Sequence, residues 1–216
     1  MSKTATTYTY GDVRKHCQYG DAWIAIHGKV YDVSKFNSHP GGAIIHTAYG
    51  RDGTILFETH HNCVDDVKAR EMLKKFEIGV IADYKPCCRF DTPFAKALLS
   101  GVKEKIKGKE LRDSMYAYTA CLFFYFLFVT GVYMAFTSGH YGWAFYLGLV
   151  MSIGHLAGHA GNHWAVSKYD IVNRFMSMTC TSLWGLREKN WEFSHLISHH
   201  CYNYTDRDYI MEQHVP

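Results

Sequence analysis

The sequence has no Asp, Glu, Lys or Arg between Ser114 and Ser167, although charged residues are spread through residues 1–113. One charged side chain at the centre of a membrane helix costs roughly 2.5 to 3.5 kcal/mol, so this charge-free stretch is typical of a segment that enters a membrane. The alternative is a buried helical hairpin of a soluble protein. We predict a membrane segment after residue 113.

Other common signatures are also missing. The seven cysteines include no Cys-x-x-Cys pair, which argues against a zinc ribbon or a disulfide framework and favours reduced thiols. Residues 1–10 contain no apolar run, so we expect no cleaved signal peptide and a cytosolic N-terminal domain. The net charge of +3 is small and its lysines are scattered among acids. We therefore expect no nucleic-acid partner.

Two apolar stretches within the charge-free segment predict a transmembrane hairpin. Tyr116 to Phe136 has close to the ~20 residues that a hydrocarbon core requires, and a second passage runs from Tyr141 to around His159. Basic residues flank the hairpin on both sides, which predicts that both of its ends are cytosolic. These residues lie between Lys103 and Arg112 before the hairpin and at Lys168, Arg174 and Arg187 after it. Tyr169 to Trp191 mixes charges with large apolar residues, as expected of an interfacial helix.

The N-terminal part has a different pattern. Short apolar runs such as Trp23–Ile26 and Lys29–Val33 are separated by turn signals, which predicts short strands between helices. The predicted organisation is an N-terminal domain at residues 1–85, a basic linker reaching a membrane surface at 86–113, and a membrane domain at 114–216. The predicted fold class is an α+β domain followed by an all-α membrane domain with a helical hairpin and interfacial helices.

A His-Pro-Gly-Gly motif at residues 39–42 follows one of the predicted strands. The two glycines allow the backbone to turn sharply and approach a flat ligand, with the histidine directed into a pocket. The motif and its surroundings together resemble the cytochrome b5 domain over nearly the full length of that domain. The matching residues are Trp23, Val30–Phe36, His39–Gly42, Gly50–Thr54 and Phe57-Glu58. This resemblance implies a small α+β fold that holds one haem b between two histidines.

The resemblance assigns the first axial ligand to His39. Desaturase-fused members of the family place the second histidine four residues after the phenylalanine, which is His61 here. The alternative, His60, points about 100° away on the same helix, and both cannot face one iron. His46 stands where the family usually has an apolar residue. Two axial imidazoles leave no open position on the iron, so we expect one-electron transfer rather than oxygen chemistry.

A second set of histidines follows the predicted hairpin. His155, His159 and His163 are spaced i, i+4, i+8, and His195 and His199 are again one helical turn apart. Histidines at a membrane boundary are costly unless they bind or pair. Imidazole suits iron, zinc and copper alike. The sequence has no His-Glu-x-x-His motif and only Glu192–His195 has Glu-x-x-His spacing in this region, so neither a zinc protease nor a carboxylate-bridged di-iron site is expected.

The segments His159-Ala160-Gly161-Asn162-His163 and His195–His200 resemble the first and second histidine boxes of the membrane fatty acid desaturases. Together with the haem domain they are most similar to the front-end group. Ala160 replaces the usual aspartate, a departure that affects a supporting position and not the ligands. The resemblance implies that His159, His163, His195, His199 and His200 bind two iron ions. The family's third histidine box is absent, and His214 alone does not replace it, so we expect a truncated chain with an incomplete iron site.

The implied activity is oxygen-dependent desaturation of long-chain fatty acyl groups in the endoplasmic reticulum membrane, by a multi-pass enzyme whose haem domain and histidine boxes face the cytosol. Its implied partners are a cytochrome b5 reductase-type electron donor, the acyl substrate and membrane lipid. A fatty-acyl or sphingolipid hydroxylase, a sphingoid desaturase, and a membrane-anchored haem electron carrier without catalysis are the alternatives. Carboxylates near the second haem histidine could steer the reductase or form an ordinary solvated face; they are Asp52, Glu58, Asp65, Asp66 and Glu71.

Overall fold

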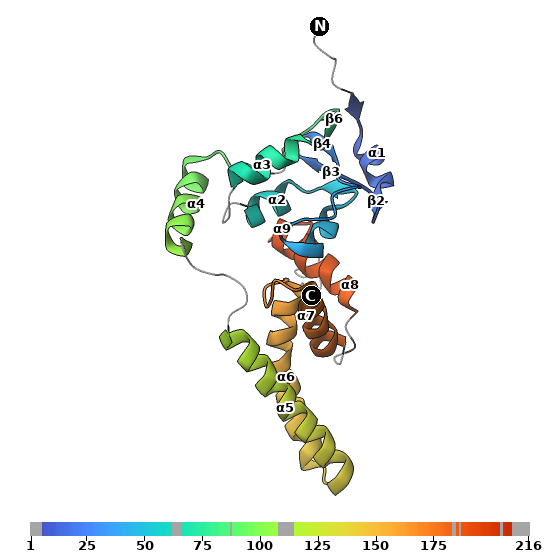
Figure 1. Cartoon of the computed structure of the whole chain (residues 1–216), viewed down its shortest axis with the longest axis vertical. Helices are drawn as coiled ribbons and strands as arrows, with labels where there is room; N and C mark the ends of the chain where they lie inside the picture. Colours follow the sequence, from blue (N-terminus) through green and yellow to red (C-terminus); the bar gives the residue numbers. More distant parts are fainter. Residues whose placement is uncertain are drawn as a thin grey trace. The chain divides into compact units, whose positions relative to one another are not determined.

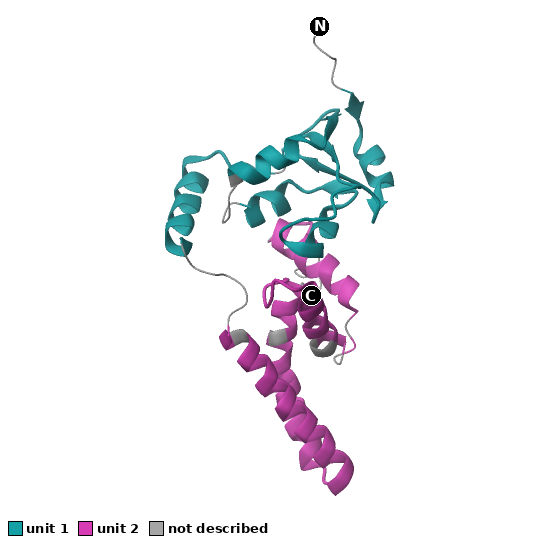
Figure 2. Ribbon diagram, viewed as in Figure 1, with its two compact units in different colours: residues 1–109 teal, residues 110–216 magenta. Residues whose placement is uncertain are grey.

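A computed structural model describes residues 6–61, 66–86, 88–107, 115–182, 185, 187–203 and 205–208. The chain divides into two compact units, residues 1–109 and residues 110–216 (Figure 2). The first unit contains the predicted N-terminal domain and most of the predicted linker. The predicted boundary between the linker and the membrane domain, at residues 113 and 114, lies outside the described residues.

The first unit is built on a small mixed sheet with the strand order β1-β6-β4-β3-β2, and β5 pairs with β3 (Figure 1). The central hairpin turns at His27 and Gly28, both with positive φ (49° and 73°). This is the conformation that two-residue hairpin turns require. The strands are β1 (Thr7–Tyr8), β2 (Cys17–Gln18), β3 (Asp21–Ile26), β4 (Lys29–Asp32), β5 (Arg51–Asp52) and β6 (Glu77–Ile81).

Helices accompany this sheet along the chain, which confirms the predicted α+β class. The first of them, α1 (Tyr10–Lys15), starts with a capping box in which Thr9 and Asp12 satisfy each other's backbone N–H. The others in this unit are the 3₁₀ helix η1 (Gly42–Ala48), α2 (Thr54–His61), α3 (Asp66–Lys74) and α4 (Pro93–Ile106).

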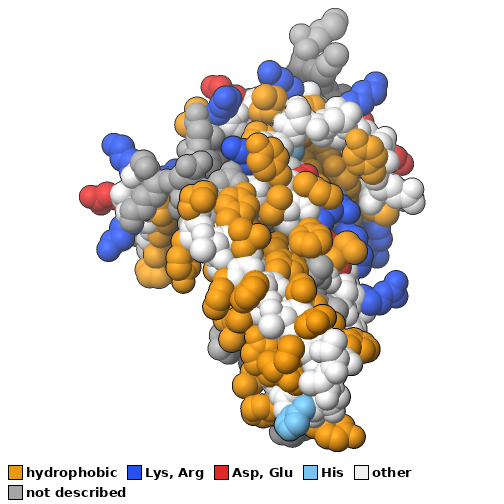
Figure 3. All heavy atoms as spheres, turned by 60° about the horizontal axis from the view of Figure 1, so that its bottom comes forward, with side chains coloured by type: hydrophobic (Ala, Val, Ile, Leu, Met, Phe, Trp, Pro, Cys, Tyr) orange, Lys and Arg blue, Asp and Glu red, His pale blue; other side chains and the backbone are white. Residues whose placement is uncertain are grey.

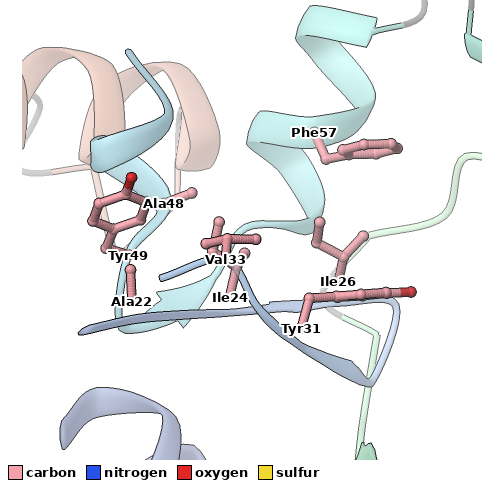
Figure 4. Close-up of a cluster of buried hydrophobic side chains, with 8 residues drawn as sticks. All are labelled: Ala22, Ile24, Ile26, Tyr31, Val33, Ala48, Tyr49 and Phe57. Carbon is pink, nitrogen blue, oxygen red and sulfur yellow. The ribbon is translucent and has the colours of Figure 1, made fainter. Parts of the chain in front are cut away.

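Alternation along β3 and β4 buries side chains on both faces of the sheet. Ile24, Ile26 and Tyr31 pack with Phe57 of α2 on one face (Figure 4). Ala25 and Val30 point to the other face and pack with Val13 of α1 and Ile81 of β6. The core therefore fixes α2, which carries His60 and His61 at its C-terminal end.

Glu58 is buried on the same helix, with 3% of its surface exposed. Its carboxylate accepts hydrogen bonds from Arg70 of α3 at 2.8 and 2.9 Å and contacts Nε2 of His27 at 2.6 Å. Glu58 consequently joins α2 to α3 and to the β3–β4 turn. It is not part of an exposed acidic surface, so the suggestion that Glu58 helps to steer a reductase is wrong. The side chains of Asp65 and Asp66 lie outside the described residues.

We expect Glu58→Gln to lower the free energy of unfolding of this unit by about 1–3 kcal/mol, the range for hydrogen bonds to charged groups. Burial alone would raise the pKa of Glu58, but the hydrogen bonds from Arg70 and His27 outweigh it and hold the pKa below the ordinary 4.5. The stabilisation is therefore present above pH 4.5 and is lost as the pH falls through the lowered pKa.

Hydrogen exchange of the α2 and α3 amides across a urea series, at neutral and acidic pH, measures this effect. Glu77→Gln is the matched control, because Glu77 pairs with Lys29 at 2.9 Å on the surface, where such a pair contributes less than about 1 kcal/mol. Equal losses in the two variants would contradict a structural role for the buried carboxylate.

The second unit begins with a hairpin of two long helices, α5 (Met115–Ser138) and α6 (Gly142–Asn162). Gly131 and Gly154 lie at their contact, where an added Cβ would come within 2.7 Å of Leu147 and 2.1 Å of Phe124. Large apolar side chains cover the outer surface of the hairpin (Figure 3). In the most apolar 18-residue stretch of α5, only 17% is buried within the protein.

Among the described residues, one helix is long and apolar enough to cross a membrane, Tyr118–Ser138. The structure thus contains the predicted hairpin, but α6 does not meet the same criterion. Five glycines and two histidines in its 21 residues account for this. The second crossing therefore stays a prediction.

Shorter helices follow the hairpin and pack on the end of α6. Gly161 lets α7 approach closely, since a Cβ there would lie 2.8 Å from the carbonyl oxygen of Asn173. Asn162 bonds Ser177 and Thr181 across the same contact. These helices are α7 (Asp170–Ser177), the π-helix η2 (Met178–Ser182), α8 (Glu188–Trp191), the π-helix η3 (Glu192–His199) and α9 (His200–Tyr202). The mostly helical character of this part confirms its predicted class.

Candidate haem pocket and histidine cluster

His39 lies in the turn between β4 and η1. The two glycines that follow it, Gly41 and Gly42, are each required for a different structural reason. Gly42 has φ of 76°, a conformation that residues with a side chain rarely adopt. A Cβ on Gly41 would lie 2.8 Å from Cε1 of His39, so any larger residue there would displace the imidazole. The Pro-Gly-Gly step therefore both turns the chain and makes room for the His39 ring.

His61 faces His39 from the last turn of α2. The two ring centroids are 5.9 Å apart with their planes at 73°. In each ring Nδ1 contacts a backbone carbonyl, that of Gly42 at 3.2 Å for His39 and that of Phe57 at 2.9 Å for His61. An Nδ1–H that donates to a carbonyl leaves the lone pair on Nε2, the tautomer that binds a metal.

His60 has a different environment from its neighbour. It is exposed, and its Nδ1 contacts the carbonyl of Leu56 at 2.8 Å. His61 stacks on Phe57 with ring centroids 4.3 Å apart, and burial lowers its pKa below 6.5. A neutral imidazole is the form that coordinates iron. The geometry therefore pairs His61, and not His60, with His39, while His46 lies half-buried in η1.

A second histidine cluster forms in the other unit, where ligand atoms of His159, His163, His195 and His200 all lie within 4.8 Å of one another. The Nε2 atoms of His159 and His163 are 2.9 Å apart. His195 Nε2 lies 3.1 Å from that of His159 and 3.1 Å from that of His200. Two histidines at the end of α6 thus converge with two from η3 and α9.

The winding of η3 decides which histidines converge. The sequence spacing predicts that His195 and His199 share a face, as they would in an α-helix. The chain is instead a π-helix from Glu192 to His199, whose hydrogen bonds join residues five apart and which is wound more widely than an α-helix. The ring of His200 consequently lies 4.6 Å from that of His195, closer than the ring of His199 at 5.5 Å. Widened turns of this kind occur frequently at functional sites.

His199 lies beside the four-histidine cluster, with its ring centroid 5.5 Å from those of His195 and His200. Its Nδ1 contacts both carboxylate oxygens of Asp208, at 3.0 and 3.1 Å. Asp208 is completely buried. A carboxylate behind an imidazole is the usual way to orient a metal-binding histidine. Sequence reasoning missed Asp208, although an aspartate soon after a histidine box is a signal that could have been weighed.

The cluster has the donor chemistry of a metal site. Burial, followed by the neighbouring imidazoles of His200 and His159, lowers the pKa of His195 to about 3. His195 is therefore neutral at physiological pH and offers a nitrogen lone pair. Trp191 stacks on it at 4.3 Å and shields one side. His155 lies half-buried on α6, one turn before His159 and outside the group of four.

Residues 9–82 match the family model of the "Cytochrome b5-like Heme/Steroid binding domain". The chain is 31% identical to Delta(5) fatty acid desaturase A of Dictyostelium discoideum over 94% of this chain. It is also 31% identical to Delta(8)-fatty-acid desaturase 1 of Arabidopsis thaliana over 96% of this chain. Cytochrome B5 isoform C of Arabidopsis thaliana is 43% identical over 35% of this chain and 56% of its own length.

The chain spans 46% of the length of each of these two desaturases. The similarity to them extends through both units, whereas the match to the cytochrome b5 family model is confined to the first. The first unit therefore contains a cytochrome b5-like domain, and the chain as a whole is similar to fatty acid desaturases over somewhat less than half of their length.

Proposed function

We propose that this chain is the haem-bearing and iron-binding part of an oxygen-dependent desaturase of long-chain fatty acyl groups. The single observation that carries the proposal is the convergence of imidazole nitrogens from two separate histidine motifs, within 4.8 Å of one another. That convergence occurs in a chain whose other unit has a cytochrome b5-like domain. Neither unit alone would suggest both electron supply and oxygen chemistry.

Residues 1–85 would hold the haem, with His39 and His61 as its iron ligands. Their ring centroids lie 5.9 Å apart, so both imidazoles could reach one iron ion. Phe36 is partly buried with its ring centroid 6.0 Å from that of His39 and would supply an apolar wall. Bound haem would provide one-electron transfer, and the protein groups would fix the two imidazoles by their Nδ1 contacts.

His159, His163, His195 and His200 would bind iron, and His199 would contribute a further imidazole oriented by Asp208. Imidazole nitrogens suit iron, and the similarity to fatty acid desaturases favours a histidine-rich pair of iron ions as the occupant of this cluster. Bound iron would supply oxygen activation. The protein would hold His195 neutral at physiological pH, keep Trp191 against it, and fix His199 through Asp208.

The substrate, the donor and the location follow from the family and remain part of the proposal. The relatives are named for acyl substrates, so a long acyl chain entering from the membrane is the proposed substrate, and a cytochrome b5 reductase-type flavoprotein is the proposed donor. We propose the endoplasmic reticulum membrane as the location, with the haem domain and the histidine cluster in the cytosol.

A glycosylation acceptor in the Thr137–His140 turn should then be modified in microsomes, whereas one at the N-terminus should not.

The proposal is tested with the full-length gene product expressed in yeast supplied with long-chain fatty acids. We expect a new double bond in the lipid extract by gas chromatography, reduced at least a hundredfold by His163→Ala with the haem spectrum intact. His140→Ala, in the exposed α5–α6 turn, should retain activity. A hydroxylated product would identify a hydroxylase instead, and unchanged activity in His163→Ala would refute the iron assignment.

A further inference from the structure

Helix α4 (Pro93–Ile106) has no buried residue along its 14 positions. Phe94 is 77% exposed, Leu98 55% and Val102 36%. Isolated helices of this length are only marginally stable in water, since most helical stability in proteins comes from packing an apolar face. The Thr92 cap and Pro93 define where α4 begins, but they do not replace such packing. The exposed apolar residues of α4 therefore need another surface to pack against if the helix is to be stable.

The apolar residues of α4 form one face. At 100° per residue, Phe94, Leu98, Leu99, Val102 and Ile106 span a sector of about 140°. Lys96, Lys103 and Lys107 occupy the sector next to it. Lys105 lies on the apolar face close to the end of the helix, where a long lysine side chain can keep its ammonium group at a polar surface. Residues 93–107 carry four lysines against one glutamate.

The covalent chain keeps α4 near the membrane. Ile106 precedes Met115, the first residue of α5, by nine positions, which at full extension span about 32 Å. The helix α5 contains the described segment that is long and apolar enough to cross a bilayer. The end of α4 is thus confined to about one bilayer thickness from the point where α5 begins.

We propose that α4 lies in the interface of a lipid bilayer that carries anionic head groups, with Phe94, Leu98 and Val102 among the acyl chains and the lysines on lipid phosphates. A lysine rim beside an exposed apolar face is complementary to such a surface, and each charge strengthens the attraction. Neither the haem pocket nor the histidine cluster enters this proposal, which therefore does not depend on the assigned activity. Docked in this way, α4 would restrict the distance of the haem domain from the membrane.

Hydrogen–deuterium exchange of the full chain in lipid nanodiscs tests the proposal. Amides of residues 94–106 should exchange on the order of tenfold more slowly in discs with 30% phosphatidylserine than in phosphatidylcholine discs. Leu98→Glu should abolish the difference. Ser100→Glu introduces the same charge on the opposite face and is the matched control; it should retain most of the protection.

Equal exchange in the two lipids would overturn the proposal, because the anionic head groups would then contribute nothing to covering this face. Loss of protection to the same extent in Leu98→Glu and Ser100→Glu would also overturn it. The helix would then be attracted to the lipid by its charge alone, without burial of its apolar face. Exchange of the β3 and β4 amides, which form the core of the first unit, reports whether each variant is folded.

Discussion

Replacing His39 or His61 by alanine should abolish the low-spin haem spectrum of this protein, and His60→Ala should leave it intact. The rings of His39 and His61 face each other with their centroids 5.9 Å apart, and in the proposed haem site loss of either imidazole would remove one of the two iron ligands. His60 points from the exposed side of the same helix, so its loss changes no ligand. Absorption spectra of the purified full chain in its oxidised and reduced forms measure the effect.

His60→Ala is a close control because it removes an imidazole from the adjacent position of the same helix. A bis-histidine spectrum that survives His61→Ala but disappears in His60→Ala would reverse the ligand assignment. Haem loss in both His60→Ala and His61→Ala would instead point to disruption of α2, and circular dichroism of the two variants would distinguish that case.

His195→Ala should weaken metal binding in the second unit at least a hundredfold while the haem spectrum is unchanged. His195 is central to the cluster, with its Nε2 3.1 Å from those of both His159 and His200. Mutation of a group that hydrogen-bonds a metal ligand already lowers the metal affinity about 10- to 100-fold. Direct loss of a ligand lowers it at least as much. Titration with Co²⁺, whose visible spectrum reports nitrogen coordination, measures the affinity on the full chain.

His140→Ala is the control, since His140 is an exposed histidine outside the cluster. A second comparison tests the carboxylate beside the cluster. Asp208→Asn should weaken Co²⁺ binding less than His195→Ala, because the asparagine side chain keeps an acceptor oxygen for His199. Equal Co²⁺ affinity in the wild type and His195→Ala would mean that these imidazoles do not form a metal site.

Much of the first unit could be predicted from the sequence because its signals are local. The short strands, the turn at His27 and the His-Pro-Gly-Gly motif each occupy a few consecutive residues, and the structure contains the expected α+β unit. The burial of Glu58 could not be predicted. It depends on Arg70, which is 12 residues away on another helix, and only the packing of α3 brings the two together.

The second unit shows the same division at its histidines. Spacing along the sequence picked out histidines that the structure brings together, and at the end of α6 regular helical winding places His159 and His163 in contact as expected. For His195 the spacing indicated only His199, because it assumes 3.6 residues per turn. In the more widely wound η3 the ring of His200 lies nearer to His195, at 4.6 Å against 5.5 Å. Asp208 was missed for a related reason, since it reaches His199 only when the chain after α9 folds back.

The sequence by itself determined the similarity to the cytochrome b5 domain, the α+β and helical classes of the two parts, and the positions of the histidines. These properties depend on residue types and short-range order, such as the charge-free stretch from Ser114 to Ser167. The tertiary structure alone decided which imidazoles face one another and which carboxylates are buried. Those outcomes depend on side-chain direction, which changes by about 100° with each residue of a helix and is set by winding and by contacts between distant segments.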